Sequence, residues 1–287
     1  MSDDLTVIGH PFPKVDGLGK ASGQATYADD LHLPQMLFGR LLGSHRPHAR
    51  IVRIDASKAE ALPGVKAVIT GQDFREKYGI LPVSAVFATV FAGTRFVGDP
   101  IAAVAAVDEF TCEEALRLIE VEYEDLPVAM TVDDALEPVT EEHRIHDYGV
   151  EGNVHKQVNL EFGEVDSAMD EAAHVLEGVY FYSGNNHLAM EEHSAVAQYG
   201  ADGKLTLWSS TQTPHYVHKA LAKVLDMPAG RIRVIATPNG GGFGGKSDPF
   251  PHEFCAARLS MITGRPVKIT LTREEVFYTH RGRHPVL

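Results

Sequence analysis

The residues best suited to chemistry form a glycine-rich segment, Asn239 to Ser247 (NGGGFGGKS). Five glycines surround one aromatic residue, Phe243, and the segment lies between a strand-like run and a helix-like run. A backbone without Cβ atoms can approach a flat or anionic ligand closely and offer it N–H donors. The segment is therefore predicted to bind a ligand, and its regular neighbours disfavour a plain flexible linker.

The same segment supports a competing hypothesis. Gly240 to Ser247 matches the phosphate-loop pattern G-x-x-x-x-G-K-[ST], which would make the chain a phosphate-loop nucleotide-binding protein. Against this, Pro249 and Pro251 stand where the first turns of the required helix should run. The 40 residues after Ser247 are too few for a nucleotide-binding sheet, and no apolar strand ending in Asp follows to hold magnesium. A cofactor-free assembly protein is a third hypothesis.

Other titratable residues give weaker signals. The 15 histidines include three pairs at i, i+3 spacing, but none has an obvious third ligand, so no metal site is predicted. These pairs are His45/His48, His143/His146 and His215/His218. Two pairs of adjacent glutamates, Glu191-Glu192 and Glu274-Glu275, are expected to be helix caps or surface residues. No catalytic residue is assigned.

Composition limits the class of protein. The 287 residues are 44% hydrophobic and 23% charged, which is globular and allows two domains with cores of their own. A formal net charge of -13 argues against a nucleic-acid-binding surface. Two cysteines, Cys112 and Cys255, are expected to be inert core thiols. Without a secretory signal or an 18-residue apolar run, the chain is predicted to be cytoplasmic with no membrane span.

In the first half of the chain, strand-like and helix-like runs alternate. Strands are predicted at Met36 to Ser44, Ala49 to Ile54, Val65 to Thr70 and Ile101 to Val107, and a short helix at Ser57 to Leu62. Thr111 and Glu114 predict a capping box that starts the next helix, and a strand follows at Val121 to Tyr123. The polar stretch Glu137 to Asn153 is taken as a domain boundary.

The second half continues in the same manner. A helix is predicted at Asp166 to Ala173, and Thr213 and Pro214 should cap and start another. The remaining helix is His252 to Thr263, which Gly264 should end. Strands are predicted at Val175 to Tyr182, Lys204 to Ser210, Arg231 to Ile235 and Pro266 to Thr272.

Several motifs, in order along the chain, resemble the xanthine oxidase, aldehyde oxidase and carbon monoxide dehydrogenase family. Besides Gly240 to Lys246 they include DGLGKASGQATYAD (16–29), SHRPHARI (44–51), RFVGDPIAAVAAV (95–107), VEYEDLP (121–127), HLAMEEH (187–193) and Thr211-Gln212. The resemblance implies an α+β fold. An a/b hammerhead domain (1–140) would be followed by the first, incomplete part of the molybdopterin-binding domain (153–287).

Within the family, FGEVD (162–166), Tyr216-Val217-His218 and HRGR (280–283) point to 4-hydroxybenzoyl-CoA reductases. Purine-oxidising members usually carry Glu after the glycine-loop lysine, where this chain has Ser247. The implied activity is hydroxylation, or reductive dehydroxylation, of an aromatic, heteroaromatic or CoA-thioester substrate. Because family members continue well past residue 287, the chain is expected to be a truncated subunit or half of a split one, inactive alone.

The resemblance also implies a cofactor, a site and partners. The cofactor would be molybdenum on molybdopterin, extended by cytosine dinucleotide. Gln212 would hydrogen-bond a ligand of the metal, Phe243 and Gly244 would pack against the centre, and Gly241, Gly242 and Gly245 would supply close approach and backbone donors. His187 and His193 would brace the loop. Partners would be the C-terminal molybdenum-domain half, an iron-sulfur subunit and an FAD subunit.

Overall fold

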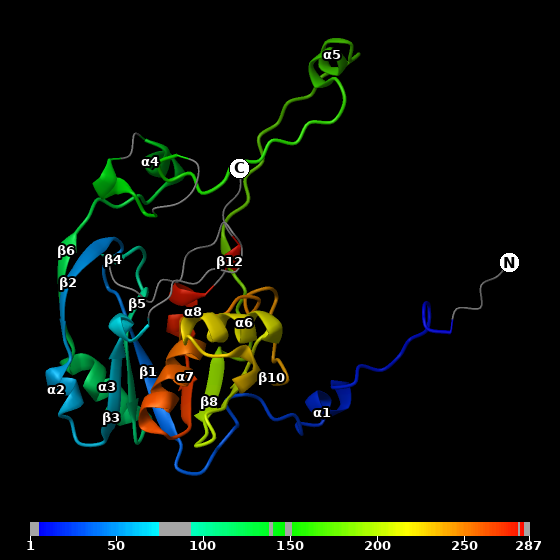
Figure 1. Ribbon diagram of the computed structural model, residues 1–287. Helices are drawn as coiled ribbons and strands as arrows, with labels where there is room; N and C mark the ends of the chain where they lie inside the picture. Colours follow the sequence, from blue (N-terminus) through cyan, green and yellow to red (C-terminus); the bar gives the residue numbers. More distant parts are fainter. Residues whose placement is uncertain (1–5, 75–92, 138–139, 147–150, 281, 284–287) are drawn as a thin grey trace.

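One seven-stranded sheet unites the two halves of the chain. Figure 1 shows the computed structural model, which describes residues 6–74, 93–137, 140–146, 151–280 and 282–283. The strand order is β10-β9-β8-β11-β1-β5-β3. The strands are β1 (Leu37–Gly43), β3 (Val65–Thr70), β5 (Pro100–Ala106), β8 (Ser194–Tyr199), β9 (Leu205–Ser209), β10 (Ile232–Ala236) and β11 (Val267–Thr270). The halves join where β1 and β11 run parallel, with Leu37 opposite Val267.

The alternation of side chains along β5 explains how the sheet is buried on both faces. Successive strand residues point to opposite faces. Ala103 and Ala105 therefore join the larger core cluster, while Ala102, Val104 and Ala106 join the smaller one. Because the larger cluster contains residues of both halves of the chain, the two halves share that core.

Helices cover both faces of the sheet. α7 (Pro251–Thr263) contacts strands from β8 to β3, and α6 (Pro214–Val224) packs on β10. On the other face α3 (Glu109–Leu118) packs on β1 and β5, and α2 (Ser57–Glu60) packs on α3. α8 (Arg273–Thr279) follows β11 directly, and α1 (Gly17–Ala21) lies near the N-terminus. None of the helices that the structure describes could cross a membrane.

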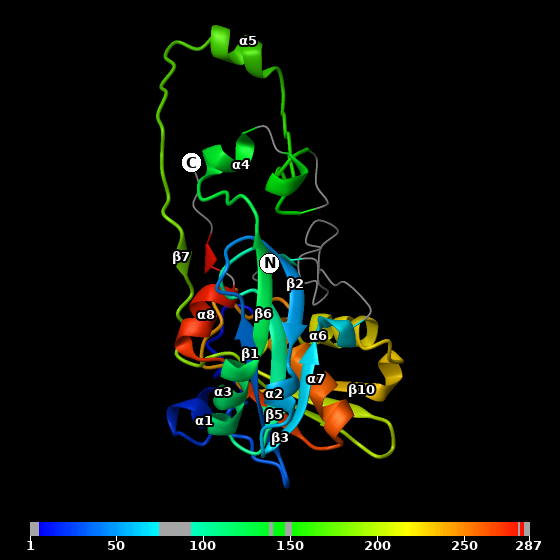
Figure 2. The same ribbon diagram turned by 90° about the vertical axis from the view of Figure 1, so that its left-hand side faces the viewer.

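A second sheet, in the order β4-β2-β6, extends above the first (Figures 1 and 2). Its strands are β2 (Ala49–Asp55), β4 (Gly93–Thr94) and β6 (Glu120–Asp125). Beyond it lie α4 (Val132–Leu136) and a projecting arm with α5 (Val165–Asp170) at its tip. The arm ends at β7 (Asn185–Asn186), which pairs with β12 (Gly282–Arg283). Every residue from 156 to 185 is exposed, so the arm has no core of its own.

Most predicted elements are confirmed within a residue or two, and Gly264 ends α7 in the left-handed conformation as expected. The capping box at Thr111 is wrong. α3 begins three residues earlier, because the Asp108 side chain accepts the Thr111 N–H and acts as the cap. Thr213 is the N-cap residue of α6 and Pro214 its first residue, as predicted, but the Thr213 hydroxyl donates to the Ser247 carbonyl and makes no capping bond.

Two strands differ from the prediction. Val175 to Tyr182 has strand-like residues, but it runs along the arm and forms no strand, with a β-bridge at Tyr182 only. Conversely, β8 was not predicted, although Ser194 to Ala197 are all buried in the middle of the main sheet. Its alanines carry little strand propensity, so its position between β9 and β11 decides its conformation.

Candidate functional site

The glycine loop, residues Asn239 to Ser247, connects β10 to α7 and lies against the segment between β9 and α6. Gln212 is the centre of this contact. Its backbone N–H donates to the Lys246 carbonyl at 2.8 Å. Its side-chain Oε1 accepts the N–H groups of Gly244 (3.1 Å) and Lys246 (3.2 Å). Gln212 is an exposed residue, and with its oxygen held by two donors its side-chain NH2 group remains able to donate to a ligand.

Three of the five glycines are required by the protein's own side chains. Each lies so close to a neighbour that an added Cβ would collide with it. The distances from such a Cβ are 2.7 Å to Glu191 Cβ at Gly240, 2.6 Å to Gln212 Cδ at Gly242, and 2.0 Å to His187 Cδ2 at Gly245. The loop is therefore packed onto Glu191, Gln212 and His187.

The outward part of the loop is formed by Phe243 and Gly244. The Phe243 side chain is 79% exposed, and its φ of 51° lies in the left-handed region. A Cβ on Gly244 would meet open space, although its φ of 83° favours glycine. Among the described residues, the N–H groups of Gly241 and Phe243 have no acceptor. An exposed ring, a bare backbone and the Gln212 amide thus lie side by side.

A buried ion pair ties the two ends of the loop together. Lys246 Nζ lies 2.7 Å from Glu191 Oε2, and the two side chains are 0% and 10% exposed. The same Glu191 oxygen accepts the Gly240 N–H at 2.8 Å. Burial lowers the pKa of Lys246, and the hydrogen bond to Glu191 opposes this shift. The expectation that Glu191 is a surface or capping residue is therefore wrong.

The ion pair also overturns the phosphate-loop hypothesis. The ammonium group of Lys246 is buried against a carboxylate and cannot reach a phosphate. In addition, α7 begins only at Pro251, so no helix N-terminus directly follows Ser247. Two other glutamates of these pairs have the roles that were expected. Glu275 completes a capping box with Thr272, and Glu192 forms a partly exposed ion pair with Arg273 at 2.9 Å.

Four histidines gather behind the loop around Phe250. The His193 ring centroid lies 3.5 Å from that of His280 and 5.8 Å from that of His252, and its Nε2 lies 3.4 Å from Nε2 of His187. Burial lowers the pKa of all four rings, that of His252 to about 3. In the described part of the chain, no three His, Cys, Asp or Glu side chains are placed so that they could hold a metal ion together. The expected brace is present, since His187 packs on Gly245.

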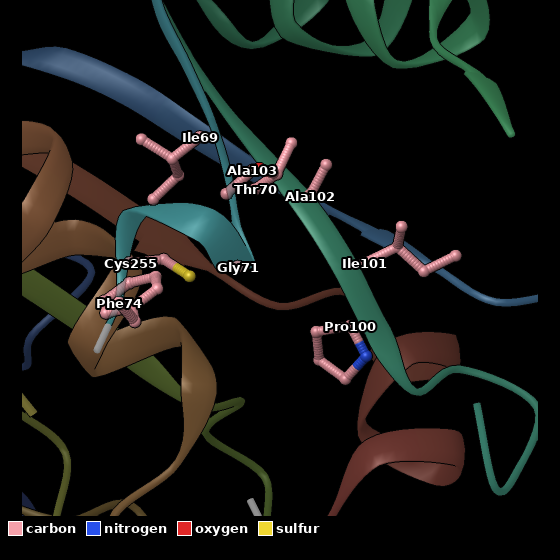
Figure 3. A pocket seen from close by; sticks show the side chains of 9 residues that line it. All are labelled: Ile69, Thr70, Gly71, Phe74, Pro100, Ile101, Ala102, Ala103 and Cys255. Atoms are coloured by element: carbon pink, nitrogen blue, oxygen red, sulfur yellow. The ribbon is translucent and has the colours of Figure 1, made fainter. Parts of the chain in front are cut away.

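The small cavity in Figure 3 is unrelated to this site. It lies between β3, β5 and α7, and its lining includes Ile69, Phe74, Ile101 and Cys255. Its volume of about 20 Å³ has room for about one water molecule. Cys255 and Cys112 are both buried, as expected of core thiols, and burial raises the pKa of each thiol to about 12.

Comparison with known families places two consecutive profiles on the chain. Residues 22–127 match the aldehyde oxidase and xanthine dehydrogenase, a/b hammerhead domain, and residues 145–287 match the molybdopterin cofactor-binding domain. Sequence relatives agree. The chain is 37% identical to the nicotinate dehydrogenase large molybdopterin subunit of Eubacterium barkeri, over 100% of the chain. It is 38% identical to a probable xanthine dehydrogenase subunit of Bacillus subtilis, over 94% of the chain.

A solved structure gives the same result. Quinoline 2-oxidoreductase from Pseudomonas putida 86 superposes on 96% of the chain with a TM-score of 0.82 and 32% identity. The chain spans 66% of the Eubacterium barkeri protein, but only 36% of the Bacillus subtilis protein and of the quinoline 2-oxidoreductase chain. The α+β fold with these two domains is thereby confirmed.

Proposed function

Because the chain belongs to the aldehyde oxidase and xanthine dehydrogenase family, as a relative of its molybdenum-binding subunits, we propose that it holds one side of a molybdopterin cofactor in an oxidoreductase. The main observation behind this proposal is that the Gln212 side chain is held by hydrogen bonds beside the exposed residues Phe243 and Gly244. The cofactor site would comprise Gln212, Gly241, Gly242, Phe243, Gly244 and Gly245.

The residues present suit such a group. The Gln212 NH2 group can donate to a ligand of the metal, and a neutral amide does so without competing for the metal itself. The free N–H groups of Gly241 and Phe243 can meet acceptor atoms of the cofactor, and Gly244 leaves open space for close approach. Gly242 and Gly245 act indirectly, since their buried positions let Gln212 and His187 support the loop.

When bound, the group would supply two-electron redox chemistry at molybdenum. The role of this chain would be to orient the metal's ligands through Gln212 and to wall off one side with Phe243. No general base is assigned, because the site's carboxylate, Glu191, is already engaged with Lys246 and Gly240. We propose the cytosine dinucleotide form of the cofactor and a cytoplasmic location.

The substrate class would be an aromatic or nitrogen-heteroaromatic compound, or an aromatic CoA thioester as in 4-hydroxybenzoyl-CoA reductases. Relatives named for nicotinate and quinoline support the heteroaromatic choice. Other relatives are named for xanthine dehydrogenase, and xanthine is a purine. The serine at position 247, in place of the glutamate usual in purine-oxidising members, disfavours a purine substrate for this chain. The Ser247 hydroxyl donates to the Gly244 carbonyl at 2.6 Å, so this hydrogen bond stabilises the loop itself.

Partners would be the C-terminal molybdenum-domain half, an iron-sulfur subunit and an FAD subunit. The exposed arm supports the first of these. It carries large apolar side chains with no partner among the described residues, including Leu176 (97% exposed), Tyr180 and Phe181. Such a segment gains stability only when another polypeptide covers it. The chain of the quinoline 2-oxidoreductase is longer than this one, and a polypeptide equivalent to its unmatched part could cover the arm.

The test is to purify the chain with its associated polypeptides from its own cells. We expect molybdenum and a pterin to copurify, together with dye-linked oxidation of nicotinate or quinoline or reduction of 4-hydroxybenzoyl-CoA. A complex that binds magnesium nucleotides and contains no molybdenum would refute the proposal.

A further inference from the structure

The hydrogen bonds of His187 determine which ring nitrogen carries its proton. Nδ1 lies 3.1 Å from the backbone nitrogen of Ala189 and must accept, because a backbone N–H can only donate. In the neutral ring the proton is then on Nε2. That nitrogen lies 3.4 Å from Nε2 of His193, which therefore serves as the acceptor. Both rings must be neutral for this arrangement to exist.

The pair supports the glycine loop directly. The His187 ring fills the space beside Gly245, where even one added carbon would lie 2.0 Å from Cδ2. The Gly245 N–H donates to the Gly242 carbonyl at 2.7 Å, and Gly242 in turn packs on Gln212. A displacement of His187 would therefore be transmitted through the loop to Gln212.

The surrounding charges disfavour a proton on either ring. Burial lowers the pKa of His187, and the charges of Lys246 in the loop and Arg273 of α8 lower it further. His193 faces His280, His252 of α7 and Lys246. The carboxylates beside them are engaged: Glu191 with Lys246, Glu192 with Arg273, and Glu253 of α7 with Ser209 and the Phe250 N–H.

We propose that His187 and His193 form an acid-sensitive latch, which holds the glycine loop in its cofactor-binding shape only while both imidazoles are neutral. A proton on His187 Nδ1 would displace the Ala189 N–H. A proton on His193 Nε2 would face the Nε2–H of His187. Either event breaks the link and frees the ring that supports Gly245. Only the cofactor consequence rests on the proposed function; the response of the loop does not.

Two tryptophan reporters can separate the loop from the sheet. Trp208 is the single native tryptophan and lies on β9, so it reports on the main sheet. The variant Phe243→Trp/Trp208→Phe reports on the loop. On acidification, we expect the loop signal to change at a higher pH than the sheet signal, because the latch opens before the core does.

Substitutions that keep the hydrogen bonds but cannot titrate test the latch. In the loop-reporter protein, His193→Gln retains an acceptor for His187, and His187→Asn retains one for Ala189. Because either ring alone can open the latch by taking up a proton, each single change should lower the pH of the loop transition, and only the two changes together should bring it down to that of the sheet. The control is His215→Gln, which alters an exposed histidine of α6 and should have no effect. If Phe243→Trp does not fold, the amide signal of ¹⁵N-labelled Gly245 replaces it.

The latch is refuted if loop and sheet respond together in the parent protein, or if His193→Gln and His187→Asn leave the loop transition where it was. A second arm measures molybdenum retained by the native complex after a mild acid step, where the parent should lose several-fold more metal than His193→Gln. Absence of molybdenum at neutral pH would refute the proposed function alone, since the loop transition would still be seen.

Discussion

Gln212 lies directly beneath Gly242, so closely that a Cβ atom on the glycine would be 2.6 Å from the Gln212 Cδ. The contact exists because Oε1 of the same side chain accepts two N–H groups of the loop. The glycine at this position therefore serves a side chain of the protein itself. The geometry of the site depends on that packing as much as on any ligand.

Replacing Gly242 by alanine should disturb the loop. The added methyl group must push Gln212 aside, and overpacking of this kind typically destabilises a protein by about 1–3 kcal/mol. The matched control is Gly230→Ala, where an added Cβ meets nothing within 4 Å and φ is not positive. Urea denaturation would compare the two. Equal stability of both variants would show that Gln212 has room to move.

The Glu191–Lys246 pair should behave as a buried ion pair. Glu191→Gln or Lys246→Met alone leaves one buried charge without its partner, which typically costs about 3–5 kcal/mol. The double variant should recover much of that loss. The exposed pair Lys204–Asp202, at 3.2 Å, is the control and should show no measurable coupling. Additive losses in the Glu191–Lys246 cycle would contradict this account.

Asp99 should make stability depend on pH. Burial raises its pKa to about 6, against the opposing effect of Arg95. Since the folded form holds this proton more tightly than the unfolded chain, its contribution is fully present below about pH 4 and is lost as the pH rises towards 6. Asp99→Asn should therefore match the parent at pH 4 and exceed it by up to about 3 kcal/mol at pH 7. If the urea midpoints of the parent and of Asp99→Asn differed by the same amount at every pH, this prediction would be contradicted.

The arm should matter for assembly and little for folding. The triple change Val179→Ser, Tyr180→Ser and Phe181→Ser alters only exposed side chains, so thermal unfolding of the chain should be unaffected. Copurification of the other polypeptides should fall several-fold. A drop in melting temperature without any loss of partners would show that the arm packs on this chain instead.

The sequence was most informative where local signals agreed with the tertiary fold. Pro214 and Gly264 mark the ends of helices through backbone geometry alone, and both were predicted. β8 was missed because its alanine-rich residues become a strand only by lying between β9 and β11. The residues Val175 to Tyr182 have the pattern of a strand, yet only Tyr182 forms a β-bridge, and a regular strand needs pairing along its length.

The site shows the same division. The glycine loop, Phe243 and Gln212 were found from residue types and family resemblance, and the structure brings Gln212 onto the loop. Glu191 was misjudged because its partner, Lys246, is 55 residues away in the sequence. The available signal was Lys246 itself, the lysine that suggested a phosphate loop. If this lysine is buried with the glycines around it, its charge needs a carboxylate partner elsewhere in the fold.

The most direct test is the molybdenum X-ray absorption spectrum of the native complex containing this chain. It would be recorded for the parent, for Gln212→Leu, and for the control Gln198→Leu, which changes an exposed residue of β8. We predict that all three bind molybdenum and that only Gln212→Leu alters the spectrum, because only it removes the donor to the metal's ligands. Identical spectra for parent and Gln212→Leu, or a parent complex without molybdenum, would contradict the account.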